Sequence, residues 1–580
     1  MTTDVVTSKP ETASVEDRSF AAWLTVERAA YLAMVLIAAA IRLVQLDLRP
    51  LTAAEAAEAW RAWRLTQGGI VAGATSSPLV FALNLWTFDI LGATDFLARL
   101  WPALAGALMP LLVYPLRARL GRGGALVSAM LLALSPHMVF FSRYLGGDSV
   151  VALAALLVLV ALVRYHDDQE ERWFLVGAVA LGLLLTAGSG AYLALAGLGL
   201  FVYAWGPEIW HSLGALPAGK MARRAAVGFA LSVALASTAL LRRWDGLGDT
   251  AALLARWLAG FRPAWGEYPF FWPGLRLLVD EPLLTVGGVA AILMLLHERR
   301  RGFTGGLAAW AVGALVVNML HSGRQAGDLV VVIVPLSLLT GPIFIRFLGG
   351  LDLRENWREA AILLGAVAVL SVMAFFWLAG YAQTGNQDYL LAFAVPLVIL
   401  AGMAGFYYFG FRWEPTWHTL GLAGLAILAL TTVSIAWVSN QYVEPVRRPA
   451  IVLETGATGV RDLVAQVEFI SARRVSDKYE IALTIVGDPP DPILMWYFRR
   501  FTAVRFTAGV GPDVGSPVVI TSASPLPPLG EGYAGSQFPV RDVWSPLALS
   551  GRDFLRWLLY RIGDGVGRVD KVVLWVEQQG

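Results

Sequence analysis

Long runs of apolar residues, each close to the thickness of a lipid bilayer, recur along most of this 580-residue chain. A helix of roughly 20 apolar residues crosses the hydrocarbon core and satisfies its own backbone hydrogen bonds there. Because these runs follow one another with only short polar breaks, we predict a polytopic membrane protein built mainly of α-helices. The composition agrees, since 57% of the residues are hydrophobic and only 15% are charged.

The distribution of Lys and Arg orients the predicted spans. These residues gather in alternate loops, which are expected on the cytoplasmic side. The N-terminal tail (residues 1–27) is then cytoplasmic, and the transmembrane region (residues 28–438) begins with an uncleaved anchor and ends outside after about thirteen spans. The predicted spans are 28–46, 97–116, 123–141, 148–165, 173–187, 190–205, 223–241, 282–297, 305–320, 328–346, 359–380, 389–409 and 417–438.

Two outer loops are expected to carry structure of their own. The first, residues 52–91, contains segments 52–67 and 76–91, both predicted to be helices at the membrane surface. The alternative, that 76–91 is a span, would move every later Arg cluster outside. The second loop, residues 242–281, holds several Arg among aromatic residues. Its arginines could extend toward lipid headgroups, or the loop could be a lid that binds an anionic headgroup.

The composition changes after the last predicted span. Residues 445–580 gain Pro, Gly, Asp and short β-branched runs that alternate with amphipathic segments, so a small extracytoplasmic α/β domain is predicted. No dinucleotide-binding, P-loop or nucleophile-elbow motif occurs in this part of the chain. The predicted strands are 450–455, 480–487, 503–508, 517–523 and 571–577, and the predicted helices are 460–474, 491–501 and 551–563.

Charge and cysteine content exclude several classes of function. The formal net charge is only +2, which gives no general basis for nucleic-acid binding. The chain contains no cysteine, so disulfides, thiolate catalysis and Cys-ligated metal sites are all excluded.

The first outer loop contains the earliest candidate site residues. Glu55 and Glu58 lie about one helical turn apart and therefore share a helix face, and Glu58 stands three residues before Arg61, suitable for an ion pair. Glu55 could act as a general base or metal ligand at a membrane-embedded cleft. The alternative is an ordinary amphipathic surface helix.

Two later junctions between predicted spans add further candidates. Arg143 and Asp148 flank a Gly-Gly turn, and Asp148 could serve a site or simply favour the start of a helix. At the second junction Arg324 could clamp a phosphate beside a helix N-terminus, with His321 next to it. The alternative there is a structural ion pair between Arg324 and Asp328.

Together these segments resemble the GT-C superfamily of polyprenyl-phosphate-sugar-dependent glycosyltransferases, which includes the protein O-mannosyltransferases and the aminoarabinose transferases of lipid A. The order and spacing hold over roughly residues 40–345. The matching segments read RLVQLDLRPLTAAEAAEAW, SSPLVFALNLWTFDILGATDFLARLWPALAGAL, LLALSPHMVFFSRYLGGDSVVALA and RQAGDLVVVIVPLSLLTG.

The resemblance implies a plasma-membrane enzyme that transfers a sugar from a polyprenyl-phosphate donor to a protein or glycolipid acceptor at the outer face, with inversion. It assigns catalysis to Glu55 and Asp148, which could also hold a divalent metal. A base would deprotonate the acceptor, and cations would stabilise the leaving phosphate. The candidate substrate-binding residues are Arg143, Arg324, Glu58 and His321.

Two positions depart from the family pattern. Ala54 stands where relatives carry an Asp before the Glu, and Ala187 stands where many carry a Lys after Thr186. An alternative therefore stays open: a non-catalytic protein that binds lipid-linked sugars, or assists their translocation, on the same scaffold. A transporter is disfavoured, because no inverted repeat of broken helices is visible and the polar residues gather outside the midplane.

Overall fold

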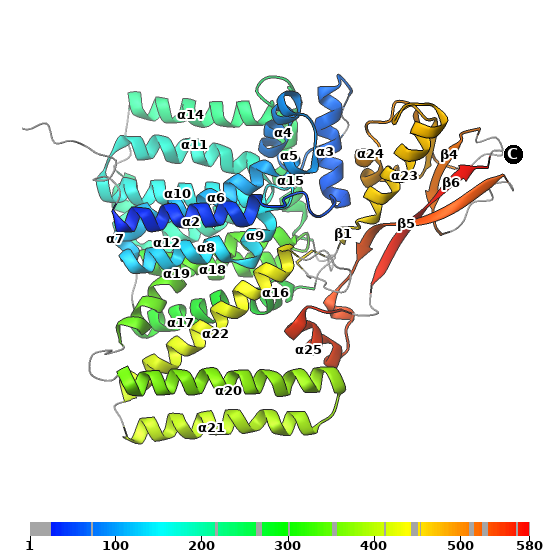
Figure 1. Ribbon diagram of the computed structural model, residues 1–580. Coiled ribbons are helices and arrows are strands. Elements are labelled where there is room, and N and C mark those ends of the chain that lie inside the picture. Colours follow the sequence, from blue (N-terminus) through cyan, green and yellow to red (C-terminus); the bar gives the residue numbers. More distant parts are fainter. Residues whose placement is uncertain are drawn as a thin grey trace, which may run out of the picture.

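A bundle of roughly parallel helices and a sheet domain at one of its ends make up the computed structural model (Figure 1). It describes residues 25–70, 73–214, 219–262, 269–299, 302–350, 357–410, 413–441, 451–452, 454–509, 515–524, 532–563 and 567–578. The predicted cytoplasmic tail lies outside these residues except for its last three. The predicted start of the C-terminal domain, residues 445–450, also lies outside them.

Every predicted span contains a helix, which confirms the predicted helical membrane fold. Within the described part, seven helices are long and apolar enough to cross a membrane, or up to nine if two bent pairs count as one span each. The bundle consists of α2 (Val26–Leu43), α6 (Leu100–Val113), α8 (Arg122–Leu134), α9 (Pro136–Ser142), α10 (Asp148–Asp168), α11 (Glu171–Ala187), α12 (Gly190–Trp205), α14 (Lys220–Ser237), α17 (Pro282–His297), α18 (Phe303–Leu320), α19 (Leu329–Gly349), α20 (Trp357–Thr384), α21 (Asp388–Gly410) and α22 (Trp413–Gln441).

Helix α19 forms the centre of the bundle and α21 its periphery. The apolar stretch of α19 is 78% buried by other parts of the protein, whereas that of α21 is 6% buried. Since both helices are strongly apolar, the exposed surface of α21 suits lipid tails. Pro335 and Pro342 lie inside α19, where neighbouring helices can satisfy the backbone groups that proline leaves free.

Short helices gather at the bundle end that faces the C-terminal domain (Figure 1). The predicted pair in the first outer loop is present as α3 (Ala53–Thr66) and α4 (Pro78–Leu91), and α3 runs across the bundle end. Fourteen residues give α4 a length of about 21 Å, shorter than the hydrocarbon core of roughly 30 Å. Helices α5 (Asp95–Ala98), α15 (Gly246–Ala259) and α16 (Trp272–Asp280) lie at the same end.

The C-terminal domain is built on a six-stranded mixed sheet with strand order β1-β5-β6-β4-β2-β3. Strand β2 pairs in parallel with β3 and β4, and the remaining pairs are antiparallel. The predicted small α/β domain is thus confirmed. Its elements are β1 (Glu454–Gly456), α23 (Gly459–Arg474), β2 (Leu483–Val486), α24 (Pro492–Tyr497), β3 (Val504–Thr507), β4 (Val518–Ser522), β5 (Tyr533–Val543), α25 (Gly551–Tyr560) and β6 (Arg568–Glu577).

Strand β5 was not predicted from the sequence. Its residues, YAGSQFPVRDV, contain no apolar run and are mostly solvent-exposed or half-buried. The strand forms because β6 pairs with it along nearly its whole length, and Pro539 lies at an irregularity in that pairing, where a missing N–H is tolerated.

One aspartate joins the C-terminal domain to the bundle end. Asp95 accepts hydrogen bonds from Trp496 Nε1 (2.8 Å), Tyr497 Oη (2.6 Å) and Arg461 Nη2 (2.9 Å). Tyr497 Oη in turn accepts the backbone N–H of Leu51 at 3.0 Å. Burial would raise the pKa of Asp95, but the hydrogen bonds from these three side chains outweigh it and hold the pKa below its usual value. The ionised carboxylate therefore anchors the domain.

Replacing Asp95 by Ala is expected to loosen the docked domain, because three donors lose their shared acceptor. The chain has no native cysteine, so a single cysteine at the buried position Leu51 reports the change. We expect its reaction with a maleimide to accelerate at least roughly tenfold in the D95A background. The control Asp462→Ala, at an exposed position of α23, should leave the rate unchanged. Equal rates in all backgrounds would show that other contacts hold the domain.

Candidate active site

A cavity of about 470 Å³ lies at the bundle end, beneath the C-terminal domain. Its walls come from α3, the turn before α10, α15, the turn before α19, β1 and Val452. Asp148, Glu58, His321 and Arg324 line this cavity, as expected for residues of one site. Glu55 and Arg143 instead line a neighbouring pocket of about 40 Å³. The structure therefore separates the predicted set into two groups.

Asp148 contributes a carboxylate to the cavity wall. It begins α10, where the helix dipole favours an anion. Its side chain is half-buried, lines the cavity, and receives no hydrogen bond from any other described residue. It also packs closely on Gly327: a Cβ there would lie 2.2 Å from Asp148 Oδ1. The adjacent Asp328 is near enough for its charge to act on Asp148.

Three cationic or ionisable nitrogen groups line the wall formed by α15 and the turn before α19. Arg324 donates to the carbonyl groups of Asn318 and Met319, and so caps the end of α18 while facing the cavity. His321 Nε2 lies 2.8 Å from the Trp257 carbonyl oxygen, which fixes α15 to this turn. Arg256, also on α15, is exposed and lines the cavity. This wall is suited to an anionic group.

The arginines of the 242–281 loop divide between two roles. Arg242 forms an ion pair with Asp89 of α4, and Arg243 pairs with Asp249 at 2.9 Å. Arg256 Nη2 donates to the Thr75 carbonyl at 2.9 Å and lines the cavity. Arg242 therefore holds the start of this loop on α4, Arg243 stabilises the start of α15, and Arg256 is a candidate ligand for an anion.

Glu58 also has a clear structural task. Its Oε1 accepts the Ser76 backbone N–H at 2.8 Å and pairs with Arg61 Nη2 at 3.2 Å, as the spacing predicted. Arg61 Nη1 donates to the Ala74 carbonyl at 2.8 Å. The pair thus fixes the loop between α3 and α4 along the cavity wall.

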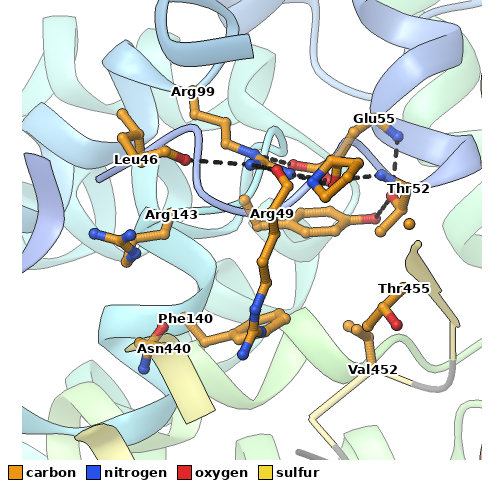
Figure 2. Close-up of a pocket in the computed structure, with 13 residues that line it drawn as sticks. Leu46, Arg49, Thr52, Glu55, Arg99, Phe140, Arg143, Asn440, Val452 and Thr455 are labelled. Carbon is orange, nitrogen blue, oxygen red and sulfur yellow. Dashed lines mark hydrogen bonds and ion pairs between the residues drawn. The ribbon is translucent and has the colours of Figure 1, made fainter. Parts of the chain in front are cut away.

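The environment of Glu55 does not suit a general base. Its fully buried carboxylate accepts two hydrogen bonds of 2.7 Å from Arg99 (Figure 2). It also accepts one of 2.7 Å from the Leu145 backbone N–H. Glu55 Oε2 also accepts the Thr52 N–H, completing a capping box at the start of α3. Both oxygens are occupied, so Glu55 holds the first loop in place. Thr52 and Glu55 have the spacing of this cap, a signal present in the sequence.

Arg143 also makes structural contacts, outside the larger cavity. Its guanidinium group donates to four carbonyl groups at the end of α2, those of Ile41, Arg42, Val44 and Gln45. Burial and the charge of Arg99 lower the pKa of Arg143 to about 10. Arg143 thus caps the end of α2, a role that its position in a turn of the sequence did not indicate.

Tyr144 is a cavity residue that sequence reasoning missed. Its hydroxyl lies 3.2 Å from Thr52 Oγ1, and the ring lines both pockets. Burial raises the pKa of Tyr144 above its usual value, and the charges of Glu55, Asp148 and Glu454 raise it further. The hydroxyl therefore remains a proton donor. Tyr144 lies in the turn just before Asp148, and this position is the feature of the sequence that could have identified it as a site residue.

The residues present do not fit the divalent metal expected from the family resemblance. No group of three or more His, Asp or Glu side chains suited to a metal occurs within the described ranges. The predicted ligand pair does not converge, because Glu55 faces Arg99 in the small pocket and Asp148 lines the larger cavity. We assign no step to a metal.

Sequence comparison finds similarity to protein mannosyltransferases over part of the chain. A family model described as dolichyl-phosphate-mannose-protein mannosyltransferase matches residues 75–234. Protein O-mannosyltransferase 1 of Drosophila melanogaster is 29% identical over 122 residues, and that of Drosophila pseudoobscura pseudoobscura is 30% identical over 138 residues. These alignments cover 20% and 22% of this chain but only 14% and 15% of the two relatives.

Structural comparison covers nearly the whole chain. ArnT from Cupriavidus metallidurans, solved bound to undecaprenyl phosphate, matches 93% of this chain and 97% of its own, with a TM-score of 0.56 and 15% identity. The apo form of ArnT matches 86% and 94%, with a TM-score of 0.51 and 16% identity. The likeness extends through the C-terminal domain, and it confirms the fold expected from the GT-C resemblance.

Proposed function

We propose that this chain, which has the GT-C fold, transfers a sugar from a polyprenyl-phosphate donor to an acceptor hydroxyl at the extracytoplasmic membrane face. The observation that carries the proposal is the cavity itself. In it, Asp148, a carboxylate that receives no hydrogen bond from any other residue that the structure describes, shares one cavity with Arg256, His321 and Arg324. A base and an anion-binding wall are the two elements that such a transfer requires.

The proposed reaction is a direct displacement at the anomeric carbon of the donor. The acceptor oxygen forms a bond to that carbon while the bond from the carbon to the phosphate oxygen breaks. Asp148 takes the proton of the acceptor hydroxyl as general base, and polyprenyl phosphate leaves with the electron pair. Arg256 and Arg324 stabilise the negative charge that develops on the leaving phosphate. A single displacement inverts the anomeric configuration.

Two observations support the lipid donor and the face. ArnT, which shares this fold, has been solved with undecaprenyl phosphate bound. The short helix α7 (Arg117–Leu120) carries Arg117 and Arg119, and it lies at the bundle end opposite α3 and the C-terminal domain (Figure 1). By the positive-inside rule that end is cytoplasmic, so the cavity and the C-terminal domain face outward.

The test is a transfer assay with purified protein, a series of labelled polyprenyl-phosphate sugars and a membrane extract as source of acceptors. We expect label to move from lipid to acceptor with at least one sugar, and undecaprenyl phosphate to inhibit the reaction as a product. Binding of undecaprenyl phosphate without any turnover would favour the non-catalytic alternative and contradict the proposal.

A further inference from the structure

The C-terminal domain places one carboxylate inside the cavity. Glu454, in β1, lines it together with Val452, and both lie far along the chain from the bundle residues of the cavity. Glu454 Oε1 accepts the backbone N–H of Ala53 at 3.0 Å, at the very start of α3. This bond fixes the carboxylate beside Ala54, another residue of the cavity wall.

One oxygen of Glu454 remains available to a ligand. Oε1 takes the Ala53 bond and lies 3.6 Å from Arg541 Nε. Oε2 has no partner within the part of the chain that the structure describes. The side chain is 34% exposed and lines the cavity. The carboxylate is thus held in position by one oxygen and open at the other.

We propose that Glu454 binds the acceptor substrate, so that the C-terminal domain completes the transfer site. The proposal rests on the glycosyl-transfer function given above. The cavity has two walls that differ in charge. Arg256 and Arg324 form the side suited to phosphate. Glu454 lies with Thr52 and Tyr144 on the side made by α3 and the turn before α10. A carboxylate there repels a phosphate and accepts hydrogen bonds from hydroxyl groups.

Tyr144 supports this assignment. Tyr144 lines the cavity with Asp148 and Glu454, and the charges of both carboxylates raise the pKa of its hydroxyl. The wall therefore offers a donor, Tyr144, close to two acceptors. Such a set suits an acceptor with more than one hydroxyl group, in which Asp148 deprotonates the reacting hydroxyl and Glu454 accepts a hydrogen bond from another.

The test compares Glu454→Gln with the wild type in the transfer assay. Gln can still accept the Ala53 bond through its own oxygen, but it loses the charge and presents an amide donor in place of Oε2. We expect transfer at limiting membrane extract to fall roughly tenfold, with a smaller loss at saturating extract. Affinity for undecaprenyl phosphate and the melting temperature should stay unchanged. The matched control is Asp491→Asn, which removes the other acidic partner of Arg541 away from the cavity.

The outcomes separate this proposal from the one on which it rests. Absence of transfer by the wild type would contradict the proposed function itself. Transfer by E454Q at the wild-type rate would contradict only the role of Glu454, even if Glu454→Ala lost activity through the missing helix cap. A loss of undecaprenyl phosphate affinity in E454Q would assign Glu454 to the donor and overturn the acceptor role.

Discussion

Replacing Asp148 by Asn is expected to reduce the transfer rate by a factor of about 10² to 10⁴, the usual contribution of a general base. Asn has nearly the same shape and can occupy the same position against Gly327, but it cannot take a proton from the acceptor. Because Asp148 receives no hydrogen bond from another described residue, the change should leave the fold and the affinity for undecaprenyl phosphate intact. Initial rates measured at equal amounts of folded protein check this expectation.

A control for this variant lies on the same helix. Asp168, at the opposite end of α10, forms an ion pair with Arg164 and is distant along the helix from the cavity. Asp168→Asn should therefore transfer sugar at close to the wild-type rate. If D148N and D168N were equally active, Asp148 could not be the base.

Replacing Glu55 by Gln is expected to have its main effect on stability. The Glu55–Arg99 pair is almost completely buried, and the guanidinium groups of Arg49 and Arg143 lie close to it in the same pocket. Burial and the charges of Arg99 and Arg143 already lower the pKa of Arg49 to about 10. Without Glu55, these three cations would share a pocket whose described lining residues include no carboxylate. Loss of one partner of a buried ion pair costs about 3–5 kcal/mol.

Thermal unfolding in detergent measures this cost, and a double variant isolates its cause. In E55Q the unpaired Arg99 remains buried, whereas Glu55→Gln combined with Arg99→Met removes the charge as well. The double variant should therefore lose less stability than the sum of the single losses. If E55Q unfolds at the wild-type temperature yet loses all transfer, Glu55 has a chemical role instead of a structural one.

Much of the fold could be predicted from the sequence because each part depends on local pattern. Apolar runs predict the helices of the bundle, and clusters of Lys and Arg predict which loops lie together at one end of the bundle. The short helices α3 and α4 follow from amphipathic segments that do not fit the charge pattern as spans. Strand β5 was missed because pairing with β6, rather than its own residues, makes it a strand.

The candidate site was predictable only in part, for the same reason. Asp148, His321 and Arg324 could be predicted because polar residues at junctions between apolar helices are candidate site residues. All three line one cavity. Glu55 was assigned to catalysis from the family resemblance, and its partner Arg99 lies 44 residues away, so no local pattern indicated their buried ion pair. Glu454 had no local signal: its contact with Ala53 joins residues 401 positions apart.

The most direct test measures transfer by D148N and E55Q side by side, each normalised to the amount of folded protein. We expect D148N to be as stable as the wild type and nearly inactive. We expect E55Q to yield less folded protein, whose remaining folded fraction still transfers sugar. The reverse result, a stable but inactive E55Q beside an active D148N, would move the chemistry to the small pocket around Glu55 and contradict this account.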